Sequence, residues 1–350
     1  MTTEYQIEED IPVVREADLA YPRKIDLGDS LLLEGDALHI LTCLPDESVQ
    51  TVVTSPPYWG LRDYGIHGQI GLEAALTQYL NRLVAVFNEV RRVLRSDGVF
   101  WLNIGDGYTS GNRGWRAPDK KNPARAMSVR PDTPEGLKPK DLIGVPWRLA
   151  FALQEDGWYL RSDIIWNKPN AMPESVKDRP TRSHEYIFML TKAEKYFYDY
   201  QAASEMSGGK PRNRRTVWDI NTLPFPDAHF ATFPPALIEP CILSSSRPGD
   251  FVLDPFLGSG TVGVVCRQTQ RRFVGIELNP EYLAIARKRI NQTDHVAPHP
   301  AFGHLLPSGE GIQPLAQRER GRGEGENGYF ENYLEEAILE PGPVVHCGGA

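Results

Sequence analysis

A glycine-rich loop between two apolar runs is the first feature of the chain that could bind a ligand. The segment VLDPFLGSGTVG places Gly258, Gly260 and Gly263 in the pattern G-x-G-x-x-G, and Glu277 closes the next predicted strand. Glycines let the backbone approach a ligand, the following helix offers free N–H groups, and an acid at the next strand end accepts hydrogen bonds from ribose hydroxyls. The pattern therefore predicts a nucleoside site, although a glycine turn that serves only helix packing has the same letters.

The residues in front of this loop bear on which nucleoside it binds. A dinucleotide such as NAD uses the same loop geometry, so a nicotinamide-dependent oxidoreductase stays open as an alternative of another class. Asp254 ends the preceding strand, where we expect its carboxylate to face the cleft. A carboxylate suits a ligand with a positive amino group better than one with a pyrophosphate, which favours S-adenosyl-L-methionine as the cofactor.

A second unusual stretch, TVVTSPPYWGLRDYG, occupies residues 51–65. Its apolar run predicts a buried strand, yet after Ser55 come two prolines and two large aromatic residues, Tyr58 and Trp59. Strand ends usually run into small polar turn residues. Taken alone, the stretch could be a strand end with aromatic residues packed in the core. Beside a cofactor loop, it indicates a functional site.

Alternating strand and helix patterns must position both stretches. The predicted strands are residues 31–36, 49–55, 99–105, 159–169, 184–192, 251–256 and 271–278. The predicted helices are residues 80–94, 146–158, 233–246, 260–270 and 280–290. Strands and helices that alternate over short connections predict an α/β domain in which helices cover both faces of a mostly parallel sheet.

Charge divides the chain into three parts. Residues 1–30 carry 8 acidic and 3 basic side chains, and residues 291–350 carry 9 acidic and 3 basic ones. Because the whole chain has a net charge of -8, residues 31–290 are net +3. We therefore predict an acidic N-terminal arm, one domain over residues 31–290 and a disordered acidic tail from 291. The basic charge gathers in two insertions, at about 105–140 and 168–225, which we expect to contact nucleic acid. The first is predicted to be irregular, and so is the part of the second that follows the strand 184–192.

Composition excludes several classes of protein. The four cysteines are scattered with no C-x-x-C pair, so we expect neither a metal site nor a disulfide framework, and the pattern fits a reducing cytoplasm. No apolar stretch approaches the roughly 20 residues that span a bilayer. The first ten residues, MTTEYQIEED, are acidic and do not resemble a signal peptide. The expected location is cytoplasmic, with no membrane partner.

Together the two motifs resemble those of bacterial and phage DNA amino-methyltransferases of the β group. In that group a motif of the form [D/N/S]-P-P-[Y/F/W] precedes the cofactor motif F-x-G-x-G. Here TSPPYW at residues 54–59 precedes DPFLGSG at residues 254–260. The resemblance covers about residues 31–290. It implies a single Rossmann-like S-adenosylmethionine-dependent methyltransferase fold, circularly permuted, that acts on double-stranded DNA.

The resemblance also implies roles for individual residues. The catalytic motif is Ser55, Pro56, Pro57 and Tyr58. Asp36 is expected at the cofactor's adenine, Glu277 at its ribose, and Phe233 with Pro234 at its methionine end. The loop itself supplies the remaining cofactor residues: Asp254, Phe256, Gly258, Ser259, Gly260 and Thr261. In the basic regions, the expected DNA contacts are Arg113, Arg116, Lys168, Arg212, Arg214 and Arg215.

The chemistry of such an enzyme gives the Ser-Pro-Pro-Tyr stretch a purpose. An exocyclic amine buried in a duplex must be flipped into a pocket before it can reach a methyl donor. Its lone pair is delocalised into the ring, so the enzyme must accept hydrogen bonds from both N–H protons to make the nitrogen nucleophilic. The Ser55 hydroxyl and a backbone carbonyl are the predicted acceptors, because Pro56 has no N–H of its own. The Tyr58 ring is the predicted stacking surface for the base.

The first residue of the motif bears on which base is modified. In the resembled group, Ser at this position goes mostly with cytosine N4 and Asp mostly with adenine N6. Ser55 therefore favours N4-cytosine methylation, with N6-adenine methylation as the alternative. Methylation at cytosine C5 would need a cysteine nucleophile. The dipeptide Pro240-Cys241 lies in an apolar helical pattern, where core packing is the expected role. A partner restriction endonuclease and a monomeric or homodimeric state are all compatible with the sequence.

Overall fold

The computed structural model describes residues 23–109, 131–223 and 233–293. Of the predicted DNA contacts, Arg113 and Arg116 lie outside the described residues. So do residues 1–22 of the predicted arm and nearly all of the predicted tail.

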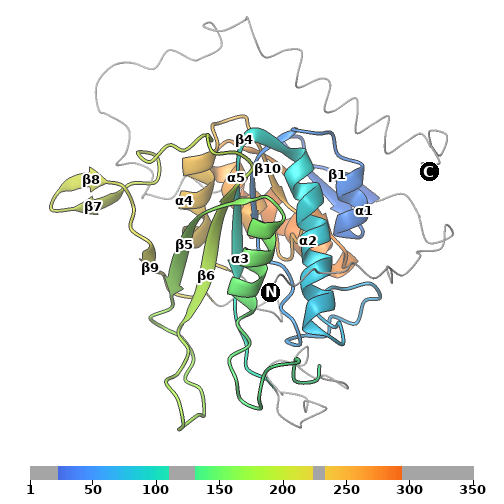
Figure 1. The fold of residues 1–350 in the computed structure, drawn as a ribbon. Helices are drawn as coiled ribbons and strands as arrows, with labels where there is room; N and C mark the ends of the chain where they lie inside the picture. The colour runs from blue at the N-terminus through green and yellow to red at the C-terminus, as the bar shows by residue number, and fades with distance from the viewer. Residues whose placement is uncertain (1–22, 110–130, 224–232, 294–350) are drawn as a thin grey trace, which may run out of the picture.

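The domain is built on one nine-stranded mixed sheet in the order β1-β2-β11-β10-β3-β4-β6-β5-β9 (Figure 1). Its central strands, which are all parallel to one another, are β2 (Ser30–Glu34), β11 (Arg272–Glu277), β10 (Phe251–Asp254), β3 (Val49–Thr54) and β4 (Leu94–Ile104). Beyond them, β6 (His184–Thr191) runs antiparallel to both β4 and β5 (Tyr159–Asn167). The edge strands are β9 (Val217–Asp219), parallel to β5, and β1 (Arg23–Asp26), antiparallel to β2. The predicted mostly parallel sheet is confirmed.

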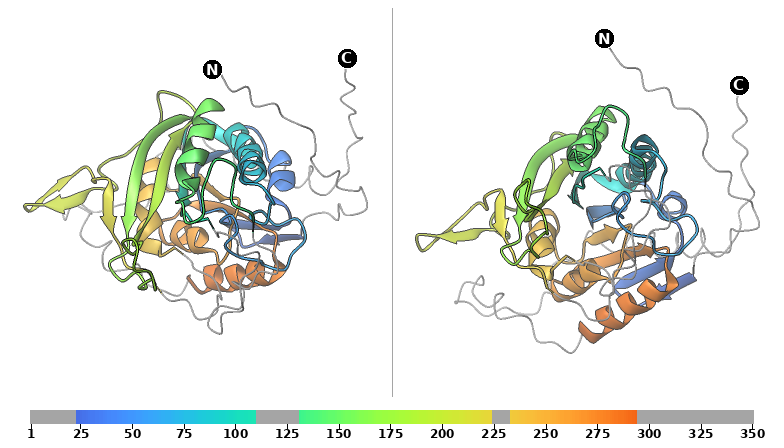
Figure 2. Two further views of the ribbon diagram at one scale, coloured as in Figure 1. Left: turned by 60° about the horizontal axis from the view of Figure 1, so that its bottom comes forward. Right: turned by 90° about the horizontal axis from the view of Figure 1, so that it is seen from below.

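Helices cover both faces of this sheet, as predicted (Figure 2). One face packs against α1 (Ala37–Thr42), α2 (Leu76–Val93) and α3 (Val145–Glu155). The other packs against α4 (Pro235–Ser245), α5 (Thr261–Gln268) and α6 (Pro280–Gln292). Alternate residues of each strand serve the two cores: in β2, Leu31 and Leu33 face the first set of helices and Leu32 faces the second. Burial on both faces explains why the strand sequences are nearly continuous apolar runs.

The structure corrects the predicted boundary of the N-terminal arm. Residues 23–26 are not loose but form β1, which pairs with β2 at the edge of the sheet. The register sets Arg23 opposite Glu34, with 3.9 Å between the guanidinium Nη1 and the carboxylate Oε2. Four residues with the sequence RKID carry too short and too polar a pattern to predict a strand.

Three further strands lie in the second basic region. A small hairpin of β7 (Glu205–Ser207) and β8 (Lys210–Arg212) extends away from the body of the domain (Figure 1). It is followed by β9 at the sheet edge. The region predicted as irregular is therefore partly a β-ribbon that stands clear of the core.

The topology determines where a ligand can bind. From β3 the chain moves outward to β4, whereas from β10 it moves outward in the other direction to β11, so the strand order reverses between β3 and β10. The carboxyl ends of β2, β11, β10, β3, β4 and β5 meet at one edge of the sheet, where β6 also begins. Open α/β sheets bind ligands at this kind of switch point. The strand of the cofactor loop thus lies beside the strand of the Ser-Pro-Pro-Tyr motif, in the permuted chain order that was predicted.

Among the helices of the described residues, none has the length and apolar character needed to cross a membrane.

Candidate active site

A cavity of about 1150 Å³ opens at the carboxyl edge of the sheet. Its wall is formed by the ends of the central strands together with the start of β6 and the loop 168–183. Cavities of about 300–1000 Å³ typically hold one drug-sized ligand. This one can therefore hold a nucleoside cofactor and a second ring beside it. It contains both motifs that the sequence identified.

Two different structural reasons explain the three glycines of the G-x-G-x-x-G pattern. Gly258 lies in the left-handed region at φ +52° and lines the cavity. A Cβ on Gly260 would lie 2.8 Å from the Cβ of Ala286, and a Cβ on Gly263 would lie 2.5 Å from Cδ1 of Ile290. Both distances are well inside carbon–carbon contact. Gly260, predicted to bind the cofactor, therefore serves the packing of α6 and does not line the cavity.

Glu277 occupies the predicted place at the end of β11. One carboxylate oxygen accepts from the N–H of Gly258 at 2.7 Å and the other from the N–H of Asn279 at 2.8 Å. Burial raises the pKa of this carboxyl to about 7, against these hydrogen bonds, which lower it. A carboxylate oxygen has lone pairs for more than one donor. Glu277 thus fixes the glycine loop to β11 and still lines the cavity, where a ribose hydroxyl could reach it.

Asp254 does not face the cavity, contrary to the prediction. Its side chain is 1% exposed, and its Oδ1 accepts from the Thr54 hydroxyl at 2.5 Å and from the N–H of Phe256 at 3.1 Å. Burial raises the pKa of Asp254 to about 7. The carboxylate therefore ties the end of β10 to the end of β3 beneath the cavity floor, instead of binding a ligand directly.

The other predicted cofactor residues divide into two groups. Those that line the cavity are Asp36, Phe233, Phe256, Ser259 and Thr261. Pro234 is buried at the N-cap of α4 and does not line it. Asp36 also caps α1, where its Oδ1 accepts from the N–H of His39 at 3.0 Å. The Ser259 carbonyl accepts from the Arg289 guanidinium at 2.7 Å, which joins the loop to α6.

The charges at this end of the cavity discriminate between cofactors. Where the described residues line the cavity from the ends of β2, β10 and β11, they include the acids Asp36 and Glu277 but neither Lys nor Arg. A pyrophosphate at these three strand ends would meet two carboxylates, while the cation near them in the cavity wall, Arg62, comes from the loop after β3. A ligand that carries ribose hydroxyls, an amino group and a positive sulfur fits the same donors and acceptors. The site fits S-adenosylmethionine and disfavours a dinucleotide.

The Ser-Pro-Pro-Tyr stretch forms the centre of the cavity wall. Ser55, Pro56, Pro57 and Tyr58 all line it, directly after β3. The Tyr58 hydroxyl donates a hydrogen bond to Oε2 of Glu185 at 2.9 Å and lies 3.5 Å from Oδ1 of Asn103. It accepts a hydrogen bond from the Ser55 hydroxyl at 3.4 Å. Burial, followed by the charge of Glu185, raises the pKa of Tyr58 well above its usual value. The phenol is therefore protonated at neutral pH.

Glu185 and Asn103 were not predicted as site residues. Glu185 is the second residue of β6 and Asn103 lies near the end of β4, so neither stands in a recognisable motif. The only available signal was their place at strand ends on the cavity edge. Lys168, predicted to contact DNA, forms an ion pair with Glu185, and its ammonium lies 4.0 Å from the centre of the Trp166 ring. The positive charge of Lys168 is therefore paired with Glu185 in the cavity wall.

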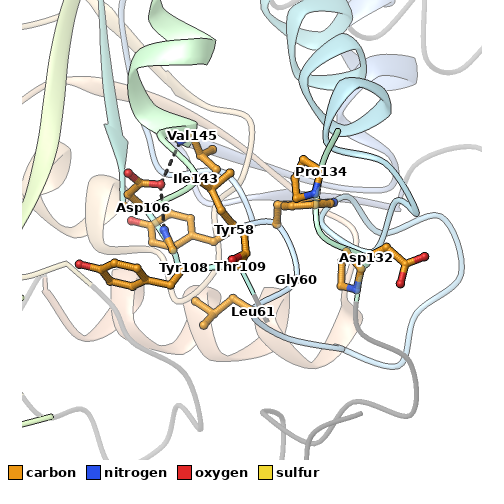
Figure 3. A pocket seen from close by; sticks show the side chains of 14 residues that line it. Tyr58, Gly60, Leu61, Asp106, Tyr108, Thr109, Asp132, Pro134, Ile143 and Val145 are labelled. Atoms are coloured by element: carbon orange, nitrogen blue, oxygen red, sulfur yellow. Dashed lines mark hydrogen bonds between the residues drawn. The ribbon is translucent and has the colours of Figure 1, made fainter. Parts of the chain in front are cut away.

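A smaller cavity of about 110 Å³ is also lined by Tyr58 (Figure 3). A Cβ on Gly105 would lie 2.6 Å from Cε2 of Tyr58, so this glycine allows the ring to rest on the end of β4. The Asp106 carboxylate accepts from the N–H of Gly144 at 2.9 Å and of Val145 at 3.0 Å, which anchors the N-terminus of α3. Negative charge is favourable at a helix N-terminus. These contacts hold the loop after β4 beside Tyr58.

The arginine cluster of the second basic region lies on and after the projecting hairpin, and none of its members lines the cavity. Arg212 and Arg215 both pair with Oε1 of Glu205, at 2.9 and 2.7 Å. Arg214 donates to the carbonyl of Ala203 at 3.2 Å. With 72% of its side chain exposed, Arg215 is the more accessible of the two paired arginines. Contact of this cluster with DNA remains a prediction.

The cysteines of the described residues take no part in the site. Cys241 and Cys266 are buried in the helices of the second face, where burial raises the pKa of both thiols, and Cys43 lies at the C-cap of α1. None of the three lines the cavity. Within the described part of the chain, no three His, Cys, Asp or Glu side chains gather in a way that could hold a metal ion.

The fold and this site define an S-adenosylmethionine-dependent methyltransferase. More narrowly, the chain belongs to the DNA methylase family N6_N4_Mtase, whose model matches residues 49–288. It is thus an enzyme that methylates DNA, and the nicotinamide alternative is set aside.

Individual relatives agree with this membership. The chain is 72% identical to the Type II methyltransferase M.Cfr9I of Citrobacter freundii over 271 residues, which are 77% of this chain and 90% of the relative. It is 62% identical to M.SmaI of Serratia marcescens over 268 residues, 76% of this chain and 92% of that protein.

Solved structures agree in fold. The cytosine-N4-specific PvuII DNA methyltransferase is 22% identical with a TM-score of 0.57, over 74% of this chain and 86% of that chain. A Thermus thermophilus protein described as a putative DNA modification methylase, solved with S-adenosyl-L-methionine, is 26% identical with a TM-score of 0.50, over 74% and 94%.

Proposed function

We propose that the protein transfers a methyl group from S-adenosylmethionine to the N4 amine of cytosine in double-stranded DNA. The observation that carries this proposal is the Ser55 hydroxyl, which lines the cavity at the end of β3 and is hydrogen-bonded to Tyr58. In this family, Ser at the first position of the motif goes mostly with cytosine N4. Adenine N6 methylation, which goes mostly with Asp at that position, is the second candidate.

The backbone of the motif supports the proposed chemistry. The amine must lose the delocalisation of its lone pair, so both of its N–H protons need acceptors. The Pro57 carbonyl already accepts from the Tyr79 hydroxyl at 2.8 Å, and the Tyr58 carbonyl accepts from the N–H of Leu61 at 3.3 Å. We assign the two acceptors to the Ser55 hydroxyl and the Pro56 carbonyl. Because neither proline has an N–H, no backbone donor competes at these positions.

The cofactor and the base would occupy opposite halves of the cavity. Asp36, Phe256, Gly258 and Glu277 would hold S-adenosylmethionine, which supplies an electrophilic methyl group when bound. The base, flipped from the duplex, would enter between the ends of β3, β4 and β6. There the Tyr58 ring offers a stacking surface worth about 1–3 kcal/mol, by analogy with single-strand binding proteins. The two halves meet at β3 and β10, where the methyl group must cross.

The structure also bears on the C5 alternative. Attack at C5 requires a thiolate beside the base. Cys241 is 1% exposed, its Sγ lies 3.8 Å from the carbonyl of Leu237 within α4, and burial raises the pKa of its thiol. A thiol in that position cannot meet a base in the cavity. Transfer to an exocyclic amine needs no such adduct.

One experiment identifies the modified base. The purified full chain is incubated with S-adenosylmethionine and methylation-free genomic DNA, which is then hydrolysed to nucleosides for mass spectrometry. The proposal expects N4-methyldeoxycytidine, and Ser55→Ala should abolish its formation while cofactor binding persists. N6-methyldeoxyadenosine or 5-methyldeoxycytidine as the product would refute it.

Sequencing the same DNA with single-molecule kinetics reports the recognition site. These relatives are named Type II methyltransferases, and we propose that this protein modifies one short DNA sequence. Arg212, Arg214 and Arg215 are our proposed backbone contacts. Phosphate contacts supply affinity without sequence information, so Arg215→Ala should weaken binding to all DNA sequences alike and reduce the salt dependence of binding.

A further inference from the structure

Three polar groups surround the hydroxyl of Tyr58. Oε2 of Glu185 lies at 2.9 Å, Oγ of Ser55 at 3.4 Å and Oδ1 of Asn103 at 3.5 Å. A phenol has one proton to donate and lone pairs with which to accept. The direction in which that proton points therefore decides what the Ser55 hydroxyl can do.

Two of the three neighbours can only accept. The Glu185 carboxylate has no proton to give, and its other oxygen is bound by the Lys168 ammonium. Asn103 uses its Nδ2 to donate to the carbonyl of Tyr186 at 3.1 Å, which turns its Oδ1 toward Tyr58. The phenolic proton consequently points at Glu185, the nearer of the two acceptors. The lone pairs of Tyr58 are left for Ser55.

Ser55 must then be the donor in its bond with Tyr58. Its single proton is directed at the phenolic oxygen, so only its lone pairs remain for the cavity. A hydroxyl held this way accepts a proton from an amine and cannot oppose it with a proton of its own. If the Ser55 proton pointed into the cavity instead, it would face an N–H proton of the target amine.

We propose that Glu185 is a positioning residue which, acting through Tyr58, keeps the Ser55 hydroxyl an acceptor for the target amine. This inference rests on the proposed function, in which Ser55 accepts from that amine, and it adds a residue outside both sequence motifs. Lys168 holds Glu185 in place from the other side and is itself held over the Trp166 ring. The side chains of Lys168 and Glu185 are only 17% and 19% exposed, so water competes little for these bonds.

The substitution Glu185→Gln reverses the chain of hydrogen bonds without changing the shape of the side chain. Lys168 needs an acceptor and takes the amide oxygen, which leaves the amide NH₂ to donate to Tyr58. The phenolic proton must then turn away from residue 185, toward the Ser55 oxygen at 3.4 Å or Oδ1 of Asn103 at 3.5 Å, and whenever it points at Ser55 the Ser55 proton turns into the cavity. We expect kcat to fall roughly 10- to 100-fold, the equivalent of losing one hydrogen bond at the reacting group. The Kd for S-adenosylmethionine and the KM for DNA should stay within about twofold.

The double variant separates this role from a purely structural one. Tyr58→Phe removes the hydroxyl that connects Glu185 to Ser55 and keeps the ring. If Glu185 acts through Tyr58, adding Glu185→Gln to Tyr58→Phe lowers kcat no further. The matched control is Glu89→Gln on α2, which alters a half-buried ion pair with Arg92 and should leave kcat unchanged.

Two results would overturn the inference. One is a kcat for Glu185→Gln equal to that of the wild type, and the other is an equal loss in the wild-type and Tyr58→Phe backgrounds. All variants are assayed on the DNA that the wild type methylates, with the product identified by mass spectrometry. If the wild type produced N6-methyldeoxyadenosine, only the assignment to cytosine would be refuted. The N6 amine of adenine also carries two N–H protons, so the kcat ratios would still test the role of Glu185.

Discussion

Replacing Asp254 with Asn isolates the effect of one buried carboxylate on the stability of the domain. Asp254 is 1% exposed, and both of its hydrogen bonds, from Thr54 and from Phe256, end on the same oxygen, Oδ1. An Asn side chain keeps an oxygen at that position and therefore keeps both bonds. The substitution removes the ionisable proton and places an amide NH₂ where Oδ2 was, a change whose effect on stability does not vary with pH.

The pH dependence follows from the pKa of the carboxyl. Burial raises it from its ordinary 3.8 to about 7 in the folded protein. Between these values the folded chain holds a proton that the unfolded chain has released, so the free energy of unfolding falls as the pH rises. The difference of about 3 pKa units corresponds to about 4 kcal/mol, at about 1.4 kcal/mol for each unit. This cost is absent below about pH 4 and complete above about pH 7.

Urea unfolding of both proteins at intervals from about pH 4 to about pH 8 measures the effect. The free energy of unfolding of Asp254→Asn, minus that of the wild type, should rise by up to about 4 kcal/mol across this range. Asp46→Asn, which alters a side chain that is 74% exposed and pairs with Arg92, is the control, and its difference should change far less across this range than that of Asp254→Asn. If the Asp254→Asn difference changes by less than about 1 kcal/mol, the buried carboxylate does not carry the cost assigned to it.

Three other substitutions test the site. Glu277→Gln should raise the Kd for S-adenosylmethionine roughly 10- to 100-fold, as measured by calorimetry, because an amide NH₂ cannot accept from Gly258 or Asn279. In the wild type, the affinity for the cofactor should increase from about pH 6 to about pH 8, because the Glu277 carboxyl has a pKa of about 7 and ionises over this range. An unchanged Kd would remove Glu277 from the cofactor site. Gly105→Ala should lower kcat and leave cofactor affinity intact, since its Cβ would lie 2.6 Å from the Tyr58 ring, and equal kcat values would contradict the packing argument. Cys241→Ala should keep methylation within about twofold in a steady-state assay and cost about 1–2 kcal/mol of stability from the lost buried volume, whereas loss of all activity would reopen a cysteine mechanism.

The sequence predicted the features that depend on local pattern. Strands buried on both faces give apolar runs, and amphipathic helices such as α2 bury residues at intervals of three and four, so the architecture could be inferred. The two motifs lie on strands that the α/β pattern makes parallel, which brings their ends to one edge. Ser55, Tyr58, Gly258 and Glu277 accordingly line a single cavity.

The sequence could not predict features that depend on direction and partners. Asp254 stands at the right strand end, but its carboxylate faces Thr54 and the Phe256 N–H instead of the ligand. Gly260 belongs to the expected motif, yet the close approach of Ala286 on α6 explains it. Glu185 reaches Tyr58 from a strand that is distant along the chain. Each of these relations arises only when separate elements pack together.

The neighbouring positions of β3 and β10 affect how the protein is made. Thr51 pairs with Val252, so about 200 residues must emerge between one partner and the other. At about 5–20 residues per second, a ribosome needs roughly 10–40 s to cover that distance. During this time β3, whose six residues are all buried in the finished fold, has an open edge that can pair with other chains. The centre of the sheet therefore closes only when β10 and then β11 emerge, because β10 pairs with β3 and β11 pairs with both β10 and β2. A nascent chain that has not yet reached Phe251 has neither a cofactor loop nor a protected centre.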